Sequence, residues 1–267
     1  MTTTLQAQTA PDYRYSINDL VRALILGWFD FQRAPVFGIV FSLIYVLGGL
    51  ALLVLGAGTF VWTLALALGF PIIAPFAATG LYEVSRRIEA HKQLDWAEII
   101  GVVWAERGKQ IPWMGVVLML IFLFWSFFAH MSFALFLGSM TLTNISTSYD
   151  MFLTGSGLAM VGFQVGVGAL TALVTFALAW QSFPALLDQD IDFVTAMIRS
   201  VRTFSANLAV ALIWAAVIAC ALFVAMLPLF LGLLVVMPVL GHATWHLYRL
   251  PLQDQAIVSP PRTEPRL

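Results

Sequence analysis

The chain has 267 residues, of which 61% are hydrophobic and only 10% carry a charge. Soluble domains carry about 25% charged residues, so this composition excludes a soluble globular protein. The net charge of −1 gives no positive excess to attract nucleic acid, and we expect no nucleic-acid partner. The class that remains is a membrane protein.

Six stretches are apolar enough to cross a membrane, whose hydrocarbon core of ~30 Å needs about 20 helical residues. They are Pro35–Gly56, Thr59–Tyr82, Ile111–Gly138, Gly157–Phe183, Leu208–Leu227 and Leu229–Leu250. We therefore predict an all-α, polytopic membrane protein with six transmembrane helices arranged as three hairpins. This domain covers residues 15–250. The tails on either side, residues 1–14 and 251–267, are predicted to be disordered.

The thirteen Lys and Arg residues are confined to four segments that alternate with the hairpins. These segments are residues 14–33, 86–109, 199–202 and 249–266, whereas the hairpin turns carry one charge in total, Asp150. Cytoplasmic loops of membrane proteins are enriched in Lys and Arg. The split therefore predicts that both termini lie on the cytoplasmic side.

An amphipathic stretch precedes the first, third and fifth spans. Apolar residues recur at helical spacing within residues 17–28, 96–103 and 194–201, a pattern typical of helices that lie in the membrane interface. Asn18, Asp95 and Asp192 are the predicted N-caps of these helices. The recurrence indicates an internal repeat, in which a cytoplasmic interfacial helix and a hairpin are used three times in parallel orientation.

Three histidines lie within the predicted spans and are the candidate metal ligands. His242 and His246 are one helical turn apart and could chelate a metal from one helix face. His130 would lie at a depth that differs from theirs by roughly 15 Å, which is too far for a shared haem. The alternative places Trp245 and Tyr248 with these two histidines in an aromatic girdle at the inner interface. We expect no cofactor.

Four prolines lie at or near the inner ends of the spans: Pro71, Pro75, Pro184 and Pro238. Prolines kink helices and free backbone carbonyls, and broken helices mark the substrate path in some transporters. These prolines are therefore candidates for a solute pathway. The alternative is that they are ordinary helix prolines whose freed carbonyls are satisfied by neighbouring helices.

Four sequence segments carry a resemblance to a known family: Trp28-x-Asp30-Phe31, Gly80–Arg87, Ser182–Asp188 and Gly241–Arg249. In these segments the chain resembles a bacterial family of predicted integral membrane proteins of unknown function, over roughly Tyr15 to Arg249. The resemblance implies a bacterial inner-membrane protein with no assigned activity. Some relatives are labelled cytochrome c oxidase subunit I-like, which implies more helices and more histidine ligands than this chain offers, so that label is not carried over.

No nucleophile elbow, phosphate loop or HExxH motif occurs in the sequence. We therefore favour a non-enzymatic accessory or scaffold subunit that contacts membrane lipids, with another membrane protein or a second copy of the chain as candidate partners. The first alternative is a transporter or binding protein for a small solute or lipid. The second alternative is a haem- or metal-binding redox membrane protein.

Overall fold

The computed structural model describes residues 13–54, 60–138 and 150–258, and within these the side chains of residues 52, 60–70, 72, 150, 151 and 254–258 are left out. The predicted disordered tails lie largely in residues 1–12 and 259–267, outside the described residues, as do most of the first two hairpin turns. The described part of the chain forms helices and no strand.

The helices follow one another with short connections. They are α1 (Ile17–Arg33), α2 (Pro35–Val54), α3 (Phe60–Glu89), α4 (Trp96–Glu106), α5 (Ile111–Leu137), the 3-10 turn η2 (Asp150–Leu153), α6 (Gly155–Ala179), α7 (Ser182–Asp188), α8 (Phe193–Ala206), α9 (Leu208–Met226) and α10 (Leu233–Val258). Each predicted span corresponds to one long helix. The three amphipathic stretches form the helices that precede α2, α5 and α9.

The N-cap of α1 differs from the prediction. Ser16, not Asn18, begins the helix: the Asp19 backbone N–H donates to the Ser16 hydroxyl, and the Ser16 N–H donates to the Asp19 carboxylate. This reciprocal capping box satisfies two backbone donors at once, which an Asn18 cap would not do. The predicted caps Asp95 and Asp192 are confirmed, because each accepts a hydrogen bond from a backbone N–H three residues later.

The C-terminal tail was also predicted to begin too early. Helix α10 continues through Pro251 to Val258, so the first part of the tail predicted from residue 251 is helical. Its continuation is supported by α3, because Gln253 donates a hydrogen bond of 2.9 Å to Glu89. At the other end of the chain, the backbone of Tyr13 accepts a hydrogen bond from Asn207, which ties this part of the predicted N-terminal tail to the junction of α8 and α9.

The six membrane spans predicted from the sequence are confirmed only in part within the described residues. Three segments of the described chain are individually long and apolar enough: Ile111–Leu137, Gly155–Asp188 and Leu208–Met226. The pair α1 and α2, bent by 104°, makes a fourth if it is counted as one broken span. The chain therefore has several apolar membrane helices, but the arrangement of six spans in three hairpins is not confirmed. Helix α10 carries His242, His246 and Arg249, which lower its mean hydropathy, and α3 begins in residues whose side chains are not described.

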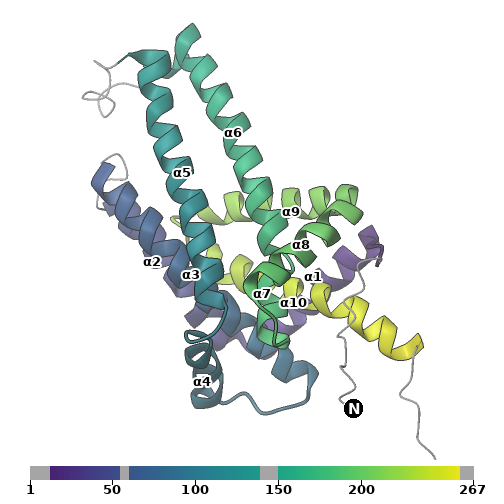
Figure 1. The fold of residues 1–267 in the computed structure, drawn as a ribbon. Helices are drawn as coiled ribbons and strands as arrows, with labels where there is room; N and C mark the ends of the chain where they lie inside the picture. Colours follow the sequence, from purple (N-terminus) through teal and green to yellow (C-terminus); the bar gives the residue numbers. More distant parts are fainter. Residues whose placement is uncertain (1–12, 55–59, 139–149, 259–267) are drawn as a thin grey trace, which may run out of the picture.

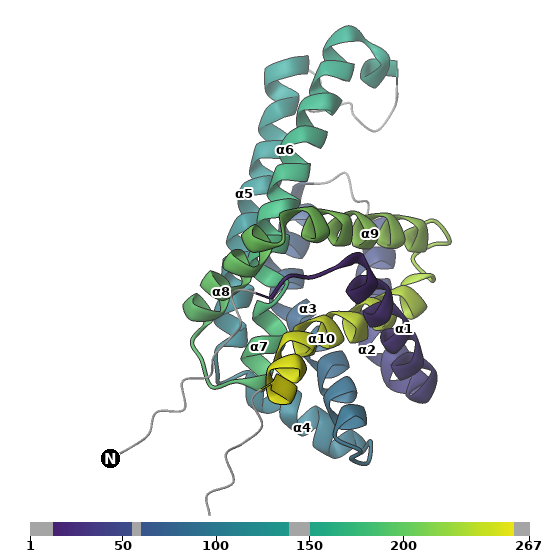
Figure 2. The same cartoon turned by 90° about the vertical axis from the view of Figure 1, so that its right-hand side faces the viewer.

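The arrangement in space also differs from three matching hairpins (Figures 1 and 2). Helices α5 and α6 lie side by side and extend beyond the rest of the molecule, whereas α9 lies across their direction in both views. The most extensive helix pairs are α1 with α10 and α3 with α5. Segments from the two ends of the sequence are therefore packed directly against each other.

The two largest of the buried clusters both include side chains of α10. One joins α1, α9 and α10 through Leu20, Trp214 and Leu247, and the other joins α5 to α10 through Met114 and Trp245. Between membrane helices, such side chains stabilise the packing through close van der Waals contact. Helix α10 contributes side chains to both of these clusters.

Candidate functional site

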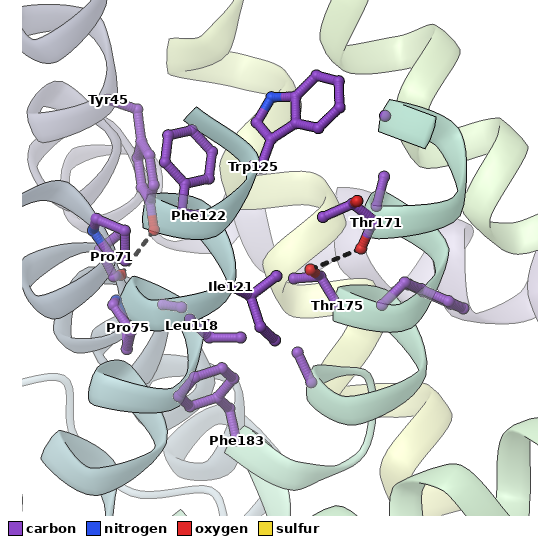
Figure 3. A pocket seen from close by; sticks show the side chains of 16 residues that line it. Tyr45, Pro71, Pro75, Leu118, Ile121, Phe122, Trp125, Thr171, Thr175 and Phe183 are labelled. Carbon is purple, nitrogen blue, oxygen red and sulfur yellow. Dashed lines mark hydrogen bonds between the residues drawn. The ribbon is translucent and has the colours of Figure 1, made fainter. Parts of the chain in front are cut away.

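An apolar cavity of about 600 Å³ lies between α3, α5 and α6, with contributions from α2 and α7. Figure 3 shows Pro71 and Pro75 of α3 on one side of it, Thr171 and Thr175 of α6 on the other, and the side chains of α5 between them. Ligand pockets in proteins usually measure about 300–1,000 Å³, so this cavity has the size of a binding site.

The hydroxyl groups that line the cavity are already hydrogen-bonded to backbone carbonyls. Tyr45 Oη donates to Ala74 at 2.8 Å, Thr171 Oγ1 donates to Val167 at 2.9 Å, and Thr175 Oγ1 donates to Thr171 at 2.8 Å. Among the described residues that line the cavity, none carries a charge. The cavity therefore offers a ligand apolar contact and little polar recognition.

One wall of the cavity depends on a glycine. Trp125 of α5 packs against Gly168 of α6, where an added Cβ would lie 2.9 Å from the Trp125 ring. Both residues line the cavity. The absence of a side chain at Gly168 lets the six-membered part of the indole ring approach α6 closely.

The structure brings together two of the four candidate pathway prolines. Pro71 and Pro75 line the cavity. Pro184 is buried in α7 next to the lining residue Phe183, but it is not itself part of the lining. Pro238 of α10 packs elsewhere, because a Cβ added at Gly38 of α2 would lie 3.0 Å from the Pro238 Cβ.

A buried polar cluster of Asp30, Ser85, His242 and His246 joins α1, α3 and α10. Ser85 Oγ lies 2.8 Å from Asp30 Oδ2 and 2.8 Å from His242 Nδ1, and His246 Nε2 lies 2.7 Å from Asp30 Oδ2. Asp30, Ser85 and His242 are each at most 5% exposed. We call these four residues the polar cluster.

The hydrogen bonds of the polar cluster determine where its protons lie. Ser85 has one hydroxyl proton and donates it to Asp30, so His242 must donate its Nδ1–H to Ser85. His242 Nε2 is then an acceptor, and within the described part of the chain it has no hydrogen-bond partner although it is fully buried. His246 donates its Nε2–H to Asp30, which therefore receives two hydrogen bonds on one oxygen.

His130 does not join the other histidines. Its Nδ1 lies 2.7 Å from the Ser126 carbonyl, on its own helix α5. In the described residues, no group of three or more His, Cys, Asp or Glu side chains is arranged to hold a metal ion. His242 and His246 instead contact Ser85 and Asp30, which the sequence analysis did not single out as site residues.

A second set of charged groups ties the far part of α10 to α3 and α7. Arg249 Nε lies 3.1 Å from Glu89, and Arg249 Nη1 lies 3.2 Å from Asp188. Tyr248 donates a hydrogen bond of 2.9 Å to the same Asp188 carboxylate, and Trp245 donates one of 3.1 Å to Glu89. The residues proposed for an interfacial girdle thus act as links between helices.

Comparison with known sequences finds one family model that matches the middle of the chain. Residues 63–188 match the family described as predicted integral membrane protein, DUF2189. The match covers just under half of the chain and agrees with the resemblance noted in the sequence. No curated protein matches the chain, and no solved structure does. All the lining residues of the cavity except Tyr45 lie within the DUF2189 match, whereas Asp30 and both histidines of the polar cluster lie outside it.

Proposed function

We propose that this protein is a non-enzymatic membrane protein that binds the hydrocarbon chain of a lipid or another apolar molecule. The observation that carries the proposal is the cavity between α3, α5 and α6, whose lining is apolar and whose hydroxyl groups are occupied by backbone carbonyls. An apolar chain entering it would be held by van der Waals packing against the lining side chains.

The proposal develops the first alternative drawn from the sequence. The accessory or scaffold interpretation rested on the lack of a catalytic motif, and it names no surface that a partner would contact. The cavity gives the binding interpretation a defined location, which includes Pro71 and Pro75. A haem- or metal-binding function has less support, because His242 and His246 are engaged with Ser85 and Asp30.

The proposal includes a location and an orientation. The resemblance supports a bacterial inner membrane, and the confinement of all Lys and Arg residues to alternate segments supports six crossings with both termini in the cytoplasm. The recurring order of one short and two long helices supports an internal repeat. In this arrangement the cavity would open within the apolar layer of the membrane.

Two variants of α6 test the binding proposal. Ala172 lines the cavity and Ala169 does not, although both are exposed small residues of the same helix. We expect wild-type protein purified in mild detergent to retain an apolar molecule, detected by native mass spectrometry and by mass spectrometry of an organic extract. Ala172→Trp should lose it because the indole fills the cavity, and Ala169→Trp should retain it.

The proposal fails if the wild-type protein carries no apolar molecule even after incubation with dioleoyl phosphatidylcholine. It also fails if Ala172→Trp and Ala169→Trp retain the same amount. Both variants should keep the melting temperature of the wild-type protein within a few degrees, which separates a filled cavity from a misfolded protein.

A further inference from the structure

A second, smaller groove of about 250 Å³ lies between α3 and α4, separate from the cavity described above. Its lining is apolar except for Arg107, and the apolar residues are Phe76, Ile100, Val103 and Trp104. Ile100 is 51% exposed and Trp104 is 63% exposed, so the groove is accessible from outside the protein.

Arg107 differs from Arg86, Arg87 and Lys109, which lie near it in the chain. Arg86 and Arg87 pair with Glu83, and Lys109 pairs with Glu106. Arg107 has no carboxylate within ion-pair distance among the described residues, and its guanidinium lies 3.7 Å from the centre of the Trp104 ring. The groove therefore has a cation without an anion at its polar part.

The groove crosses the boundary between the charged and apolar parts of α3. Phe76 lies seven residues before Glu83, the first charged residue of α3, which corresponds to ~10 Å along a helix. Helix α4 packs along the same part of the molecule, with Ile99 buried against Val84. The groove thus has an apolar lining that reaches toward the membrane interior and a guanidinium that can extend to the headgroup layer.

We propose that this groove binds one anionic phospholipid, with its phosphate on Arg107 beside Trp104 and an acyl chain along Ile100, Val103 and Phe76. Charge complementarity supports this occupant, because a guanidinium can donate two parallel hydrogen bonds to phosphate oxygens. The Trp104 ring holds the guanidinium and offers the apolar surface on which the chain begins. An apolar ligand without a charge would leave Arg107 without a counter-ion at the edge of a low-dielectric layer.

The test uses the full-length protein in detergent, titrated with dioleoyl phosphatidylglycerol, dioleoyl phosphatidylcholine or inorganic phosphate, and read by native mass spectrometry. We expect the first tight adduct to form with phosphatidylglycerol at a concentration at least about tenfold lower than with phosphatidylcholine, a difference of ~1.4 kcal/mol. Inorganic phosphate at the same concentrations should neither bind nor displace the lipid, because it has no chain to fill the groove.

Two arginine variants identify the site. Arg107→Gln should weaken the phosphatidylglycerol adduct about tenfold. Arg22→Gln, which removes an exposed arginine of α1, should leave it unchanged. Equal effects of the two variants, equal binding of the two lipids, or displacement by inorganic phosphate would each overturn the proposal. Ala172→Trp should keep the adduct, so this result does not depend on the cavity between α3, α5 and α6.

Discussion

The close crossing of α1 and α10 depends on a single residue, Gly27. A Cβ added at Gly27 would lie 2.5 Å from the Val239 carbonyl oxygen and 2.7 Å from the Ala243 backbone nitrogen. Both are backbone atoms, which cannot move aside as a flexible side chain can. The crossing in turn brings Asp30, one helical turn after Gly27, within hydrogen-bond distance of His246.

Replacing Gly27 by alanine should therefore destabilise the protein. We expect Gly27→Ala to lower the free energy of unfolding by about 1–3 kcal/mol, because the two backbones must separate. The matched control is Gly162→Ala in α6, where an added Cβ meets nothing within 4 Å and alanine favours the helix. Thermal unfolding in detergent measures both variants, and equal melting temperatures would contradict the tight crossing.

The polar cluster is stabilising only while its members remain paired. Asp30 accepts hydrogen bonds from Ser85 and His246, and removal of its carboxylate would leave the largely buried His246 Nε2–H without this acceptor. A buried polar group that loses its partner lowers the stability of the folded protein by more free energy than the intact pair contributes to it.

A pair of substitutions tests this coupling. Asp30→Leu should lower the free energy of unfolding by about 3 kcal/mol. Adding His246→Leu to the same chain should recover part of that loss, since one orphaned donor is then removed. Thermal unfolding of the two single variants and the double variant gives the coupling energy. Strictly additive losses would mean that Asp30 and His246 do not interact.

At the scale of elements, the turn between α9 and α10 is the least predictable connection. The sequence suggested a short junction at Pro228, whereas the described turn runs from Leu227 to Gly232. Leu229 and Phe230 both have positive φ, at 52° and 64°. Residues other than glycine rarely adopt this backbone conformation. Phe230 packs on Gly49 of α2, and this contact helps to hold the unusual backbone.

The six proposed crossings can be tested by finding on which side of the membrane this turn lies. In a Cys220→Ala background, single cysteines at Lys92, Ser156 and Leu231 can be labelled in intact cells with an impermeant maleimide. We expect Ser156→Cys and Leu231→Cys to react and Lys92→Cys to react only after the cells are opened. All three positions are exposed on the protein.

If Leu231→Cys reacts only after the cells are opened, the turn between α9 and α10 lies on the cytoplasmic side and the topology differs from the proposed one. Helices α9 and α10 would then enter and leave the membrane on the same side, an arrangement compatible with the direction of α9 across α5 and α6 (Figures 1 and 2). The charge split would still hold, because Arg202 and Arg249 would remain on one side in either case. The proposed number of crossings would fall from six to four.

At the scale of the whole molecule, the four segments that carried the family resemblance meet around α10. Asp30 of the first segment and Ser85 of the second contact the histidines of the fourth. Asp188, at the end of the third segment, contacts Arg249 and Tyr248. Segments far apart in the sequence thus form two sets of polar contacts. One joins α1, α3 and α10, and the other joins α3, α7 and α10.

The sequence by itself determined the class, the helices and the distribution of charge. Helix formation and membrane burial depend on local apolar content and on caps such as Asp95 and Asp192, so most ends of the long helices lie close to their predicted bounds. The exceptions are the C-terminal ends of α3 and α10, which continue to Glu89 and Val258, beyond the predicted Tyr82 and Leu250. Where local signals competed, as with Ser16 and Asn18, the choice depended on a reciprocal side-chain contact with Asp19 that the predicted pattern had not included.

Only the tertiary structure decided which helices are neighbours and therefore which side chains meet. The i and i+4 spacing of His242 and His246 suggested a shared metal, but Asp30 and Ser85 arrive from two other helices and take up their hydrogen-bonding groups. The cavity likewise needs Pro71, Trp125 and Thr171 from three helices. Apolar membrane helices can pack in many ways because their surfaces are chemically alike. The arrangement is selected by close contacts such as Gly27 against α10, and those depend on residues that are distant in the sequence.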